Sequence, residues 1–307
     1  MKDLKGLHFV TGEKGGVGKS LFAMVLLEYL NNLGIEHKFY DADRSSPDVG
    51  LAYGEFYHEF VSSLNKDTTS ELDKLNDLVN NHDDVLASNK KDITNIDLEE
   101  EEEKEEEELS TKESKTQIYF SEDRRESFRA DKLYNDVSDG NLVVVNLPAQ
   151  VELLVNKWLT NRSILDDSDF PIYYWFVTDG SPESLTLLER SLSQYGDRIE
   201  HIIVRNSGLN KSVDDAIIRH SVLESMRSLK TKMVEMPQLI LSNPQMQVVK
   251  INRLKLSDVT RSGAEIKGLG SLPQIRTKSF LQKCHIQIDK IAVFGEEKTL
   301  STTSSNN

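Results

Sequence analysis

The sequence predicts an α/β fold in which a mostly parallel sheet is flanked by helices on both faces. Short, continuous apolar runs recur along the chain, as is typical of strands buried inside a parallel sheet. Segments with apolar residues at helical spacing lie between these runs. A strand–helix–strand order of this kind favours parallel pairing with the helices packed on the sheet.

The first apolar run and the first helix enclose a glycine-rich segment. Residues 7–11 predict a buried strand and residues 21–33 predict a helix that ends at Gly34. Between them lies Glu13-Lys14-Gly15-Gly16-Val17-Gly18-Lys19-Ser20. A glycine loop between a strand and a helix is typical of a phosphate-binding loop, because backbone N–H groups and the helix N-terminus face the anion. We expect Lys19 to reach the terminal phosphates and the Ser20 hydroxyl to bind Mg²⁺.

Acidic side chains follow the second predicted strand, residues 36–40. Asp41 and Asp43 come directly after it, and residues 45–49 predict a mobile loop. Carboxylates at the carboxyl end of a strand beside a phosphate loop are well placed for Mg²⁺ and for water. An acidic turn without a ligand is the plain alternative.

Four later segments complete the predicted sheet, at residues 141–146, 171–178, 201–206 and 232–237. The first ends in Asn146, with Gln150 four residues on, and the third ends in Asn206. Helices are expected at residues 151–165, at 181–195, from 243 onwards and at 273–293, the last with an apolar stripe that includes Ile275 and Ile286.

Charge divides the chain into parts. The whole chain of 307 residues has a formal charge of −14, and residues 63–140 hold 24 acidic and 11 basic residues, which gives −13. We therefore assign residues 1–62 and 141–300 to one domain, 63–140 to an acidic insertion and 301–307 to a polar tail. The run at 98–109 predicts disorder or an exposed helix, and residues 118–120 and 128–134 predict a short strand and a short helix. An arm that mimics nucleic acid or blocks a basic face is the alternative.

The two-lysine loop resembles the deviant phosphate-loop (P-loop) ATPases, which include the ParA and MinD partition and positioning proteins. The resemblance covers residues 5–55 and 141–240, about half of the chain. It implies that Lys14 completes the site of a second copy and that Asp43 orients the attacking water. It also implies that Asp41 and Asn146 support the metal and that Asn206 contacts adenine. The nucleotide-binding residues it implies are Gly15, Gly16, Val17, Gly18, Lys19, Ser20, Leu21 and Asn206.

Glu13 departs from the strict loop motif, and Asn146 and Gln150 depart from the family pattern. The strict loop motif has glycine where Glu13 stands, and the second switch has aspartate and glycine where Asn146 and Gln150 stand. Asn146 can bond a metal-bound water but supplies no charge, so the hydrolysis rate is in question. Gln150 lacks the freedom of glycine to adopt positive φ. The Asn-Leu-Pro-Ala-Gln variant resembles ParA-like proteins of mobile elements.

The resemblance implies a slow ATP hydrolase with ATP and Mg²⁺ as cofactors. It would form a nucleotide-dependent homodimer, bind an unidentified partner protein and act in plasmid or DNA partition, mobilisation or positioning. The alternative is a nucleotide-binding scaffold or regulatory protein with little or no hydrolysis, which Asn146 favours. A kinase-like phosphotransferase would need an acceptor pocket, for which the sequence shows no motif.

The remaining features limit the partners and the compartment. Residues 201–307 hold 16 basic and 9 acidic residues. Helices that merely cover the sheet are the plainer interpretation of the helical part of this third, and the alternatives are a basic face for nonspecific DNA or a helix that docks a partner. No apolar run approaches the ~18 residues of a membrane span, so we expect no membrane partner and a cytoplasmic location. The single cysteine, Cys284, excludes an intramolecular disulfide.

Overall fold

The computed structural model describes residues 4–54, 118–123, 126–161 and 163–295. Apart from Gly54, all of these residues belong to one compact unit. Three parts of the sequence lie outside the described residues: residues 64–86, whose weak helical spacing favours a helix, the acidic run at 98–109 and the polar tail at 301–307.

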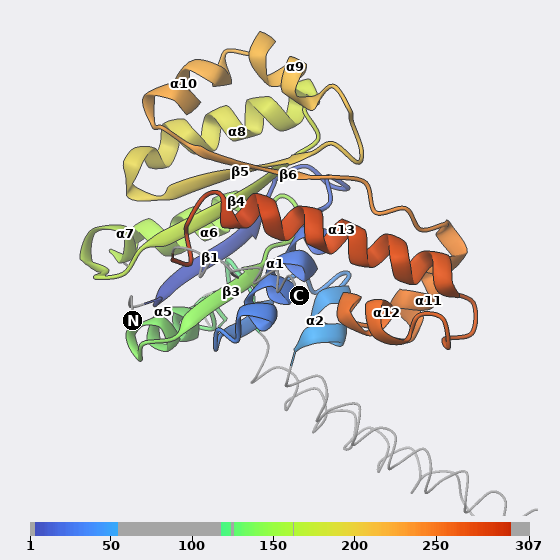
Figure 1. The fold of residues 1–307 in the computed structure, drawn as a ribbon. Coiled ribbons are helices and arrows are strands. Elements are labelled where there is room, and N and C mark those ends of the chain that lie inside the picture. The colour runs from blue at the N-terminus through green and yellow to red at the C-terminus, as the bar shows by residue number, and fades with distance from the viewer. Residues whose placement is uncertain (1–3, 55–117, 124–125, 162, 296–307) are drawn as a thin grey trace, which may run out of the picture. The chain divides into compact units, whose positions relative to one another are not determined.

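A six-stranded, all-parallel sheet forms the centre of this unit (Figure 1). Its order is β2-β3-β1-β4-β5-β6, so β1 pairs with β3 on one side and β4 on the other. The strands are β1 (Gly6–Thr11), β2 (Lys38–Asp41), β3 (Leu142–Asn146), β4 (Ile172–Thr178), β5 (Glu200–Asn206) and β6 (Lys232–Met236). The six strands predicted to form the sheet, and with them the predicted fold class, are confirmed.

Helices connect the strands and cover the sheet. They are α1 (Lys19–Leu33), α2 (Asp48–Tyr53), α5 (Asp131–Ser138), α6 (Glu152–Asn161), α7 (Ile164–Asp167), α8 (Pro182–Tyr195), α9 (Val213–Arg219), α10 (Val222–Ser228), α11 (Asn243–Ile251), α12 (Leu256–Ser262) and α13 (Ser271–Asp289). A short 3₁₀ turn, Gly196–Arg198, follows α8.

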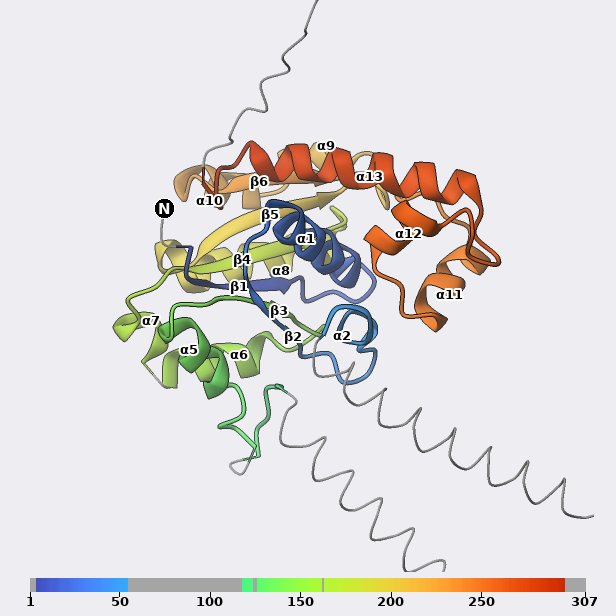
Figure 2. The same cartoon turned by 60° about the horizontal axis from the view of Figure 1, so that its bottom comes forward.

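Both faces of the sheet are buried, because alternate side chains of each strand enter different apolar clusters. In β1, Val10 packs with α1 and α13, whereas Leu7 and Phe9 pack with α5 and α6. A third cluster joins β4 and β5 to α8, α9 and α10. Figure 2 shows α1 and α13 on one side of the sheet and α5 and α6 on the other. Burial on both faces explains why the strands read as continuous apolar runs.

Two short segments differ from the sequence prediction. The end of the expected loop at 45–49 belongs to α2, which packs Val49 and Ala52 into the core beside α1. Residues 118–120 form no strand among the described residues, yet Ile118 and Tyr119 are buried. Both differences have the same cause, because packing against distant parts of the chain sets the backbone conformation of these segments. A segment this short also shows no hydrophobic periodicity from which a helix or a strand could be predicted.

The main unit also extends further than the charge boundary at residue 140 suggested. The described residues from 118 onward belong to it, and α5 buries Leu133 and Val137 between the sheet and α6. Lys132 and Lys38 both pair with Asp136, so part of the acidic charge of this region is neutralised within the fold. A net charge counted along the sequence cannot register such pairs.

Several helices also differ from their expected bounds. The expected helix at 151–165 is two helices, α6 and α7, with Ser163 between them in the left-handed conformation (φ 55°). Helices α9 and α10 were not predicted from the sequence. The last helix is α13, and it leaves Ile275 and Ile286 exposed rather than in its buried stripe.

Gly12 sets the path of the chain as it leaves β1. Its φ is 148°, and a Cβ atom at this position would lie 2.5 Å from the carbonyl oxygen of Val177 in β4. Only glycine allows β1 and β4 to remain paired while the chain turns into the loop.

We predict that Gly12→Ala lowers the free energy of unfolding by about 2–3 kcal/mol, because the new Cβ must displace backbone and the φ is strained. The matched control is Gly15→Ala, whose Cβ would meet no atom within 4 Å. We expect the control to stay within about 0.5 kcal/mol of the wild type in urea unfolding followed by circular dichroism. Equal losses in the two variants would contradict the packing role of Gly12.

Candidate functional site

The predicted site residues gather at the carboxyl edge of the sheet. Asp41 and Asn146 end β2 and β3 as register partners. Asn206 ends β5, and the glycine loop follows β1 between these strands. Because all strands are parallel, their carboxyl ends meet at one edge, where ligands of open α/β sheets bind.

The backbone of the loop leaves its N–H groups free. The N–H groups of residues 14–18 donate no hydrogen bond to any described residue. Gly16 and Gly18 have positive φ, at 76° and 101°, and a Cβ at Gly15 or Gly16 would meet only open space. Ser20 and Leu21 lie in the first turn of α1, beyond the cap residue Gly18. Free N–H groups at a helix N-terminus provide an anion-binding arrangement.

Lys19 lies under the loop. Its ammonium donates to the carbonyl oxygens of Gly12 at 2.9 Å and Lys14 at 3.2 Å. Burial lowers the pKa of Lys19, while the nearby charges of Glu13 and Asp43 act in the opposite direction. Asp43 and Lys19 are therefore close enough to interact electrostatically. The sequence predicted this grouping from two separate motifs.

Lys14 points away from the loop and toward the end of β4. Its ammonium donates to the Asp179 carboxylate at 2.8 Å and to the Ser181 hydroxyl at 2.9 Å. The hydrogen bond to Asp179 raises the pKa of Lys14. Burial opposes ionisation of Asp179, but the bonds from Lys14 and Ser181 outweigh it and lower the pKa of that carboxyl. The loop lysine is therefore held within its own chain, at the start of α8.

Asp41 and Asn146 form a buried polar pair. The Asn146 amide donates to Asp41 at 2.9 Å, and the backbone N–H groups of Gly50 and Asp43 donate to the same carboxylate. Burial raises the pKa of Asp41 to about 6, although these hydrogen bonds oppose the shift. The Oδ1 atom of Asn146 is buried and has no partner among the described residues. An unpaired buried oxygen beside a carboxylate suits a metal-bound water.

Asp43 is engaged by its own turn. Its Oδ1 atom accepts from the backbone N–H groups of Ser45 and Ser46 and from the Ser45 hydroxyl at 2.6 Å. The second carboxylate oxygen has no hydrogen bond to any described residue. Asp43 can thus position water only through that oxygen, or after the turn opens.

Asn206 supports the loop from below. Its amide nitrogen donates to the carbonyl oxygen of Val17 at 2.8 Å, and its Oδ1 atom accepts from the N–H of Leu209. A Cβ at Gly18 would lie 2.6 Å from the amide nitrogen, so glycine is needed there. These contacts give Asn206 a positioning role that the sequence analysis did not predict.

A second group missed from the sequence surrounds Glu13. The Glu13 carboxylate accepts from the N–H of Glu152 at the start of α6, and the Glu13 carbonyl accepts from the N–H of Gln150. Glu152 pairs in turn with Arg190 of α8. Burial raises the pKa of Glu13, and the nearby charge of Glu152 adds to the shift. The signal was present in the sequence, as an acid at a loop position where the strict motif has glycine.

Gln150 adopts positive φ although it is not glycine. Its φ is 61°, in the left-handed region that favours glycine, which the sequence did not lead us to expect. The N–H that it donates to Glu13 links the segment after β3 to the glycine loop.

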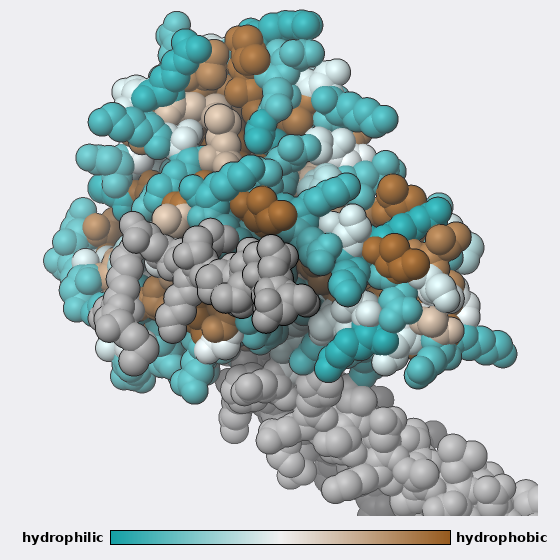
Figure 3. All heavy atoms as spheres, in the orientation of Figure 1, coloured by the Kyte–Doolittle hydropathy of each residue, from teal (hydrophilic) through white to brown (hydrophobic). Residues whose placement is uncertain are grey.

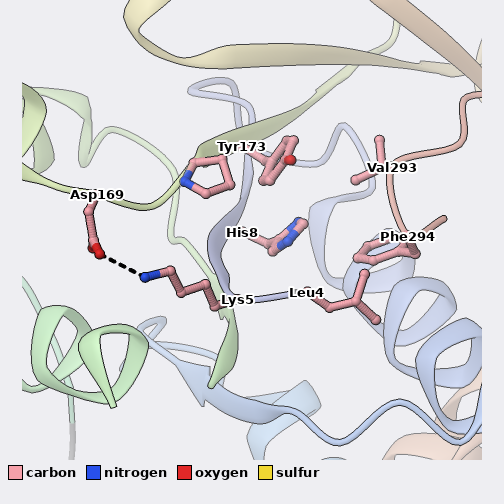
Figure 4. Close-up of a pocket in the computed structure, with 8 residues that line it drawn as sticks. Leu4, Lys5, His8, Asp169, Tyr173, Val293 and Phe294 are labelled. Carbon is pink, nitrogen blue, oxygen red and sulfur yellow. Dashed lines mark hydrogen bonds and ion pairs between the residues drawn. The ribbon is translucent and has the colours of Figure 1, made fainter. Parts of the chain in front are cut away.

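A pocket at the amino ends of β1 and β4 is separate from this edge (Figure 4). The ring of His8 stacks on Tyr173 and Phe294, and the Lys5–Asp169 ion pair lies nearby. Nδ1 of His8 accepts from the indole N–H of Trp175, and burial lowers the pKa of His8 to about 3. A neutral, stacked histidine suits a packed core better than acid–base chemistry.

Metal ligands of the conventional kind are not clustered here. The described residues contain no group of three or more His, Cys, Asp and Glu side chains that could hold a metal ion. A metal at this edge would depend on Ser20, on water held by Asp41 and Asn146, and on phosphate oxygens. No helix in the described part of the chain has the length and apolar character needed to cross a membrane.

Comparison with known proteins gives one partial likeness. No family model matches the chain. Over 51 residues the chain is 43% identical to a protein named MobD from Acidithiobacillus ferrooxidans. The match spans 17% of this chain and 22% of that protein, so it concerns a segment of each.

We predict that Asp41 makes stability fall as pH rises from about 4 to about 6. Its pKa in the folded state, about 6, lies above the ordinary value of 3.8 for an aspartate, so the folded state binds the proton more tightly. Ionisation above pH 6 then costs the folded state about 3 kcal/mol. Urea unfolding at several pH values, in EDTA and without nucleotide, measures this slope.

The comparison variant for this titration is Asp41→Asn, which cannot ionise. We expect the difference in unfolding free energy between wild type and variant to change by about 3 kcal/mol across that pH window and to be flat outside it. Parallel curves for the two proteins throughout the pH range would show that Asp41 titrates normally.

Proposed function

We propose that this protein binds ATP at the glycine loop and uses the nucleotide to switch between monomer and dimer. The observation that carries the proposal is the row of free N–H groups at residues 14–18, at the end of a central strand and above the buried Lys19. These groups suit the phosphates, with Lys19 supplying positive charge. The similarity of the loop to the ParA and MinD type supports ATP as the anion.

Mg²⁺ fits this edge as part of the proposal. The Ser20 hydroxyl starts α1, and the unpaired Oδ1 atom of Asn146 lies beside Asp41. When bound, the ion would neutralise phosphate charge and would also offset the cost of the buried Asp41 carboxylate. Asn146 holds Asp41 in place through its amide and leaves its oxygen for a metal-bound water.

Hydrolysis is the proposed activity, with Asp43 positioning the attacking water. A nucleotide-binding scaffold with little turnover is the second candidate, and two observations favour it. One oxygen of Asp43 is taken up by Ser45 and Ser46, and Asn146 replaces a charged residue of the family pattern. Both candidates share the ATP site and differ only in turnover.

Dimerisation would involve the release of Lys14 from Asp179. In the single chain this ion pair holds the lysine near α8. A nucleotide bound across two copies would offer phosphate oxygens as a replacement for the carboxylate. We infer that Lys14 exchanges these partners, which would couple nucleotide state to dimer formation.

The host process that we propose is plasmid or DNA partition, mobilisation or positioning. The altered second switch resembles ParA-like proteins of mobile elements, and the partial likeness to MobD is compatible with such a role. An unidentified partner protein and nonspecific DNA, bound through the basic C-terminal third, complete the proposal. Steep loss of DNA binding with salt would support phosphate contacts.

We predict that Lys19→Ala weakens ATP binding about tenfold or more, because a charge-assisted hydrogen bond to phosphate is lost. Lys14→Ala is the matched control and should bind ATP within about twofold of wild type as a monomer. Titration with a fluorescent ATP analogue measures both affinities. Unchanged binding by Lys19→Ala would remove the ATP site from this loop.

Single-turnover hydrolysis distinguishes the two candidate functions. We expect wild type to hydrolyse bound ATP slowly and Asp43→Ala to lose about 10²-fold in rate, because the water is no longer positioned. If both proteins bind ATP and neither hydrolyses it, the result supports a nucleotide-binding scaffold and contradicts the proposed ATP hydrolysis.

We predict that Asp179→Asn favours the ATP-dependent dimer, because it frees Lys14. Each copy in the dimer would release one partly exposed ion pair, worth up to about fivefold, so the dimer dissociation constant should fall by up to about 25-fold. Light scattering on a sizing column, with ATP, with ADP and without nucleotide, measures the effect. Lys14→Ala should abolish the ATP-dependent dimer, and a variant Asp179→Asn with weaker dimerisation than wild type would contradict the exchange.

A further inference from the structure

Helix α13 has two distinct long faces. One face packs into the protein and buries Pro273, Thr277, Phe280, Leu281, Cys284 and Ile288. The other carries large apolar side chains into solvent: Leu272 is 61% exposed, Ile275 62% and Ile286 54%. The buried face already secures the helix to the core, so these exposed side chains have no role in holding α13 in place.

The exposed apolar residues fall on a regular stripe, which we call the α13 seam. The seam comprises Leu272, Ile275, Ser279, Gln282 and Ile286, spaced alternately by three and four residues. This spacing places side chains along one line of a helix and is the spacing by which two helices interlock. Polar residues at the middle of the seam would favour one register of a partner helix.

Basic side chains flank the seam on both sides. Arg276, Lys283 and Lys290 lie on one side at seven-residue intervals, about 10 Å apart along the axis. Lys278 lies on the other side. None of these four makes an ion pair with a described residue. The acidic residue of α13, Asp289, accepts a hydrogen bond from the hydroxyl of Tyr29 at 2.6 Å.

The space-filling view shows the same arrangement on the surface. Along the strip where α13 lies in Figure 1, brown apolar side chains stand among teal hydrophilic ones (Figure 3). In Figure 2 α13 lies along the side of the sheet opposite α5 and α6, and its exposed side chains Leu272, Ile275 and Ile286 are open to a partner.

We propose that the exposed face of α13 binds an amphipathic helix of a partner protein, whose apolar stripe is flanked by acidic side chains. The three-four spacing fits an α-helix, and the basic flanks require acids opposite them. A second copy of α13 fits poorly, because its basic flanks would face these basic flanks. A nucleic acid backbone would use the cations but would leave Leu272, Ile275 and Ile286 without contacts.

The test uses the full chain and a fluorescently labelled helical peptide of three heptads. The peptide has Leu at the positions that would face the α13 seam and Glu at the positions on either side of them. Fluorescence anisotropy measures its affinity at physiological salt. We expect the wild-type protein to bind this peptide and not to bind a scrambled peptide of the same composition. The double variant I275N/R276E should weaken binding about tenfold or more.

A matched pair elsewhere on the surface provides the control. Ile218 and Arg219 are also adjacent on a helix, α9, and Ile218 is 63% exposed. The variant I218N/R219E should bind the peptide within about twofold of wild type. In addition, R276E/K283E should prefer a peptide with Lys in place of Glu, because the charges are then complementary again.

Each of four results would overturn the proposal. These are no binding of the acidic peptide, equal binding of the scrambled peptide, equal weakening by the α9 control, and no change of preference by R276E/K283E. Phosphatidylserine vesicles and duplex DNA are assayed in parallel. If either binds wild type, loses binding in I275N/R276E, and the peptide does not bind, the face recognises a membrane or nucleic acid instead.

Discussion

The hydrogen bond from the Asn206 amide to the carbonyl oxygen of Val17 holds the candidate site in shape. It ties the loop to β5 across 189 residues of sequence, at 2.8 Å. It can form only because Gly18 has no Cβ, since that atom would lie 2.6 Å from the amide. With the loop fixed from below, its N–H groups at residues 14–18 donate to no described residue, and the Lys19 ammonium donates to the carbonyl oxygen of Gly12. The candidate site is therefore preorganised by a contact that involves no ligand.

Buried carboxylates near this loop place negative charge close to the positive charge of Lys14 and Lys19. Glu13, Asp41 and Glu152 are each less than a tenth exposed, and burial raises the pKa values of Glu13 and Asp41. Burying a negative charge destabilises the folded state through desolvation, and a nearby cation would partly offset this cost. Glu13 also joins the loop to α6, and Glu152 continues this path to Arg190 of α8. A change at the proposed phosphate site would thus act on α8, the helix whose start holds Asp179, the partner of Lys14.

The α13 seam is separate from the carboxyl edge of the sheet, and a different kind of interaction would act there. The site at the strand ends depends on buried polar contacts. The α13 seam instead has exposed apolar side chains at both ends and two polar residues between them, and the cations beside it pair with no described acid. α13 packs against both α1, which starts at the loop, and β6. Nucleotide and partner would therefore bind to elements that share one core, although nothing in the proposed docking requires the nucleotide.

Local features of the sequence determined the strands, the loop and most of the residues that meet at the sheet edge. Apolar runs predict strands because both faces of this sheet are buried, and parallel strands bring Asp41 and Asn146 to the same edge. The side-chain partners came only from the tertiary structure: Asp179 for Lys14, Val17 for Asn206, and Glu152 for Glu13. The same holds for the face of α13 that stays exposed. These pairs join residues more than a hundred positions apart, and no periodicity or spacing along a chain records which distant groups burial will bring together.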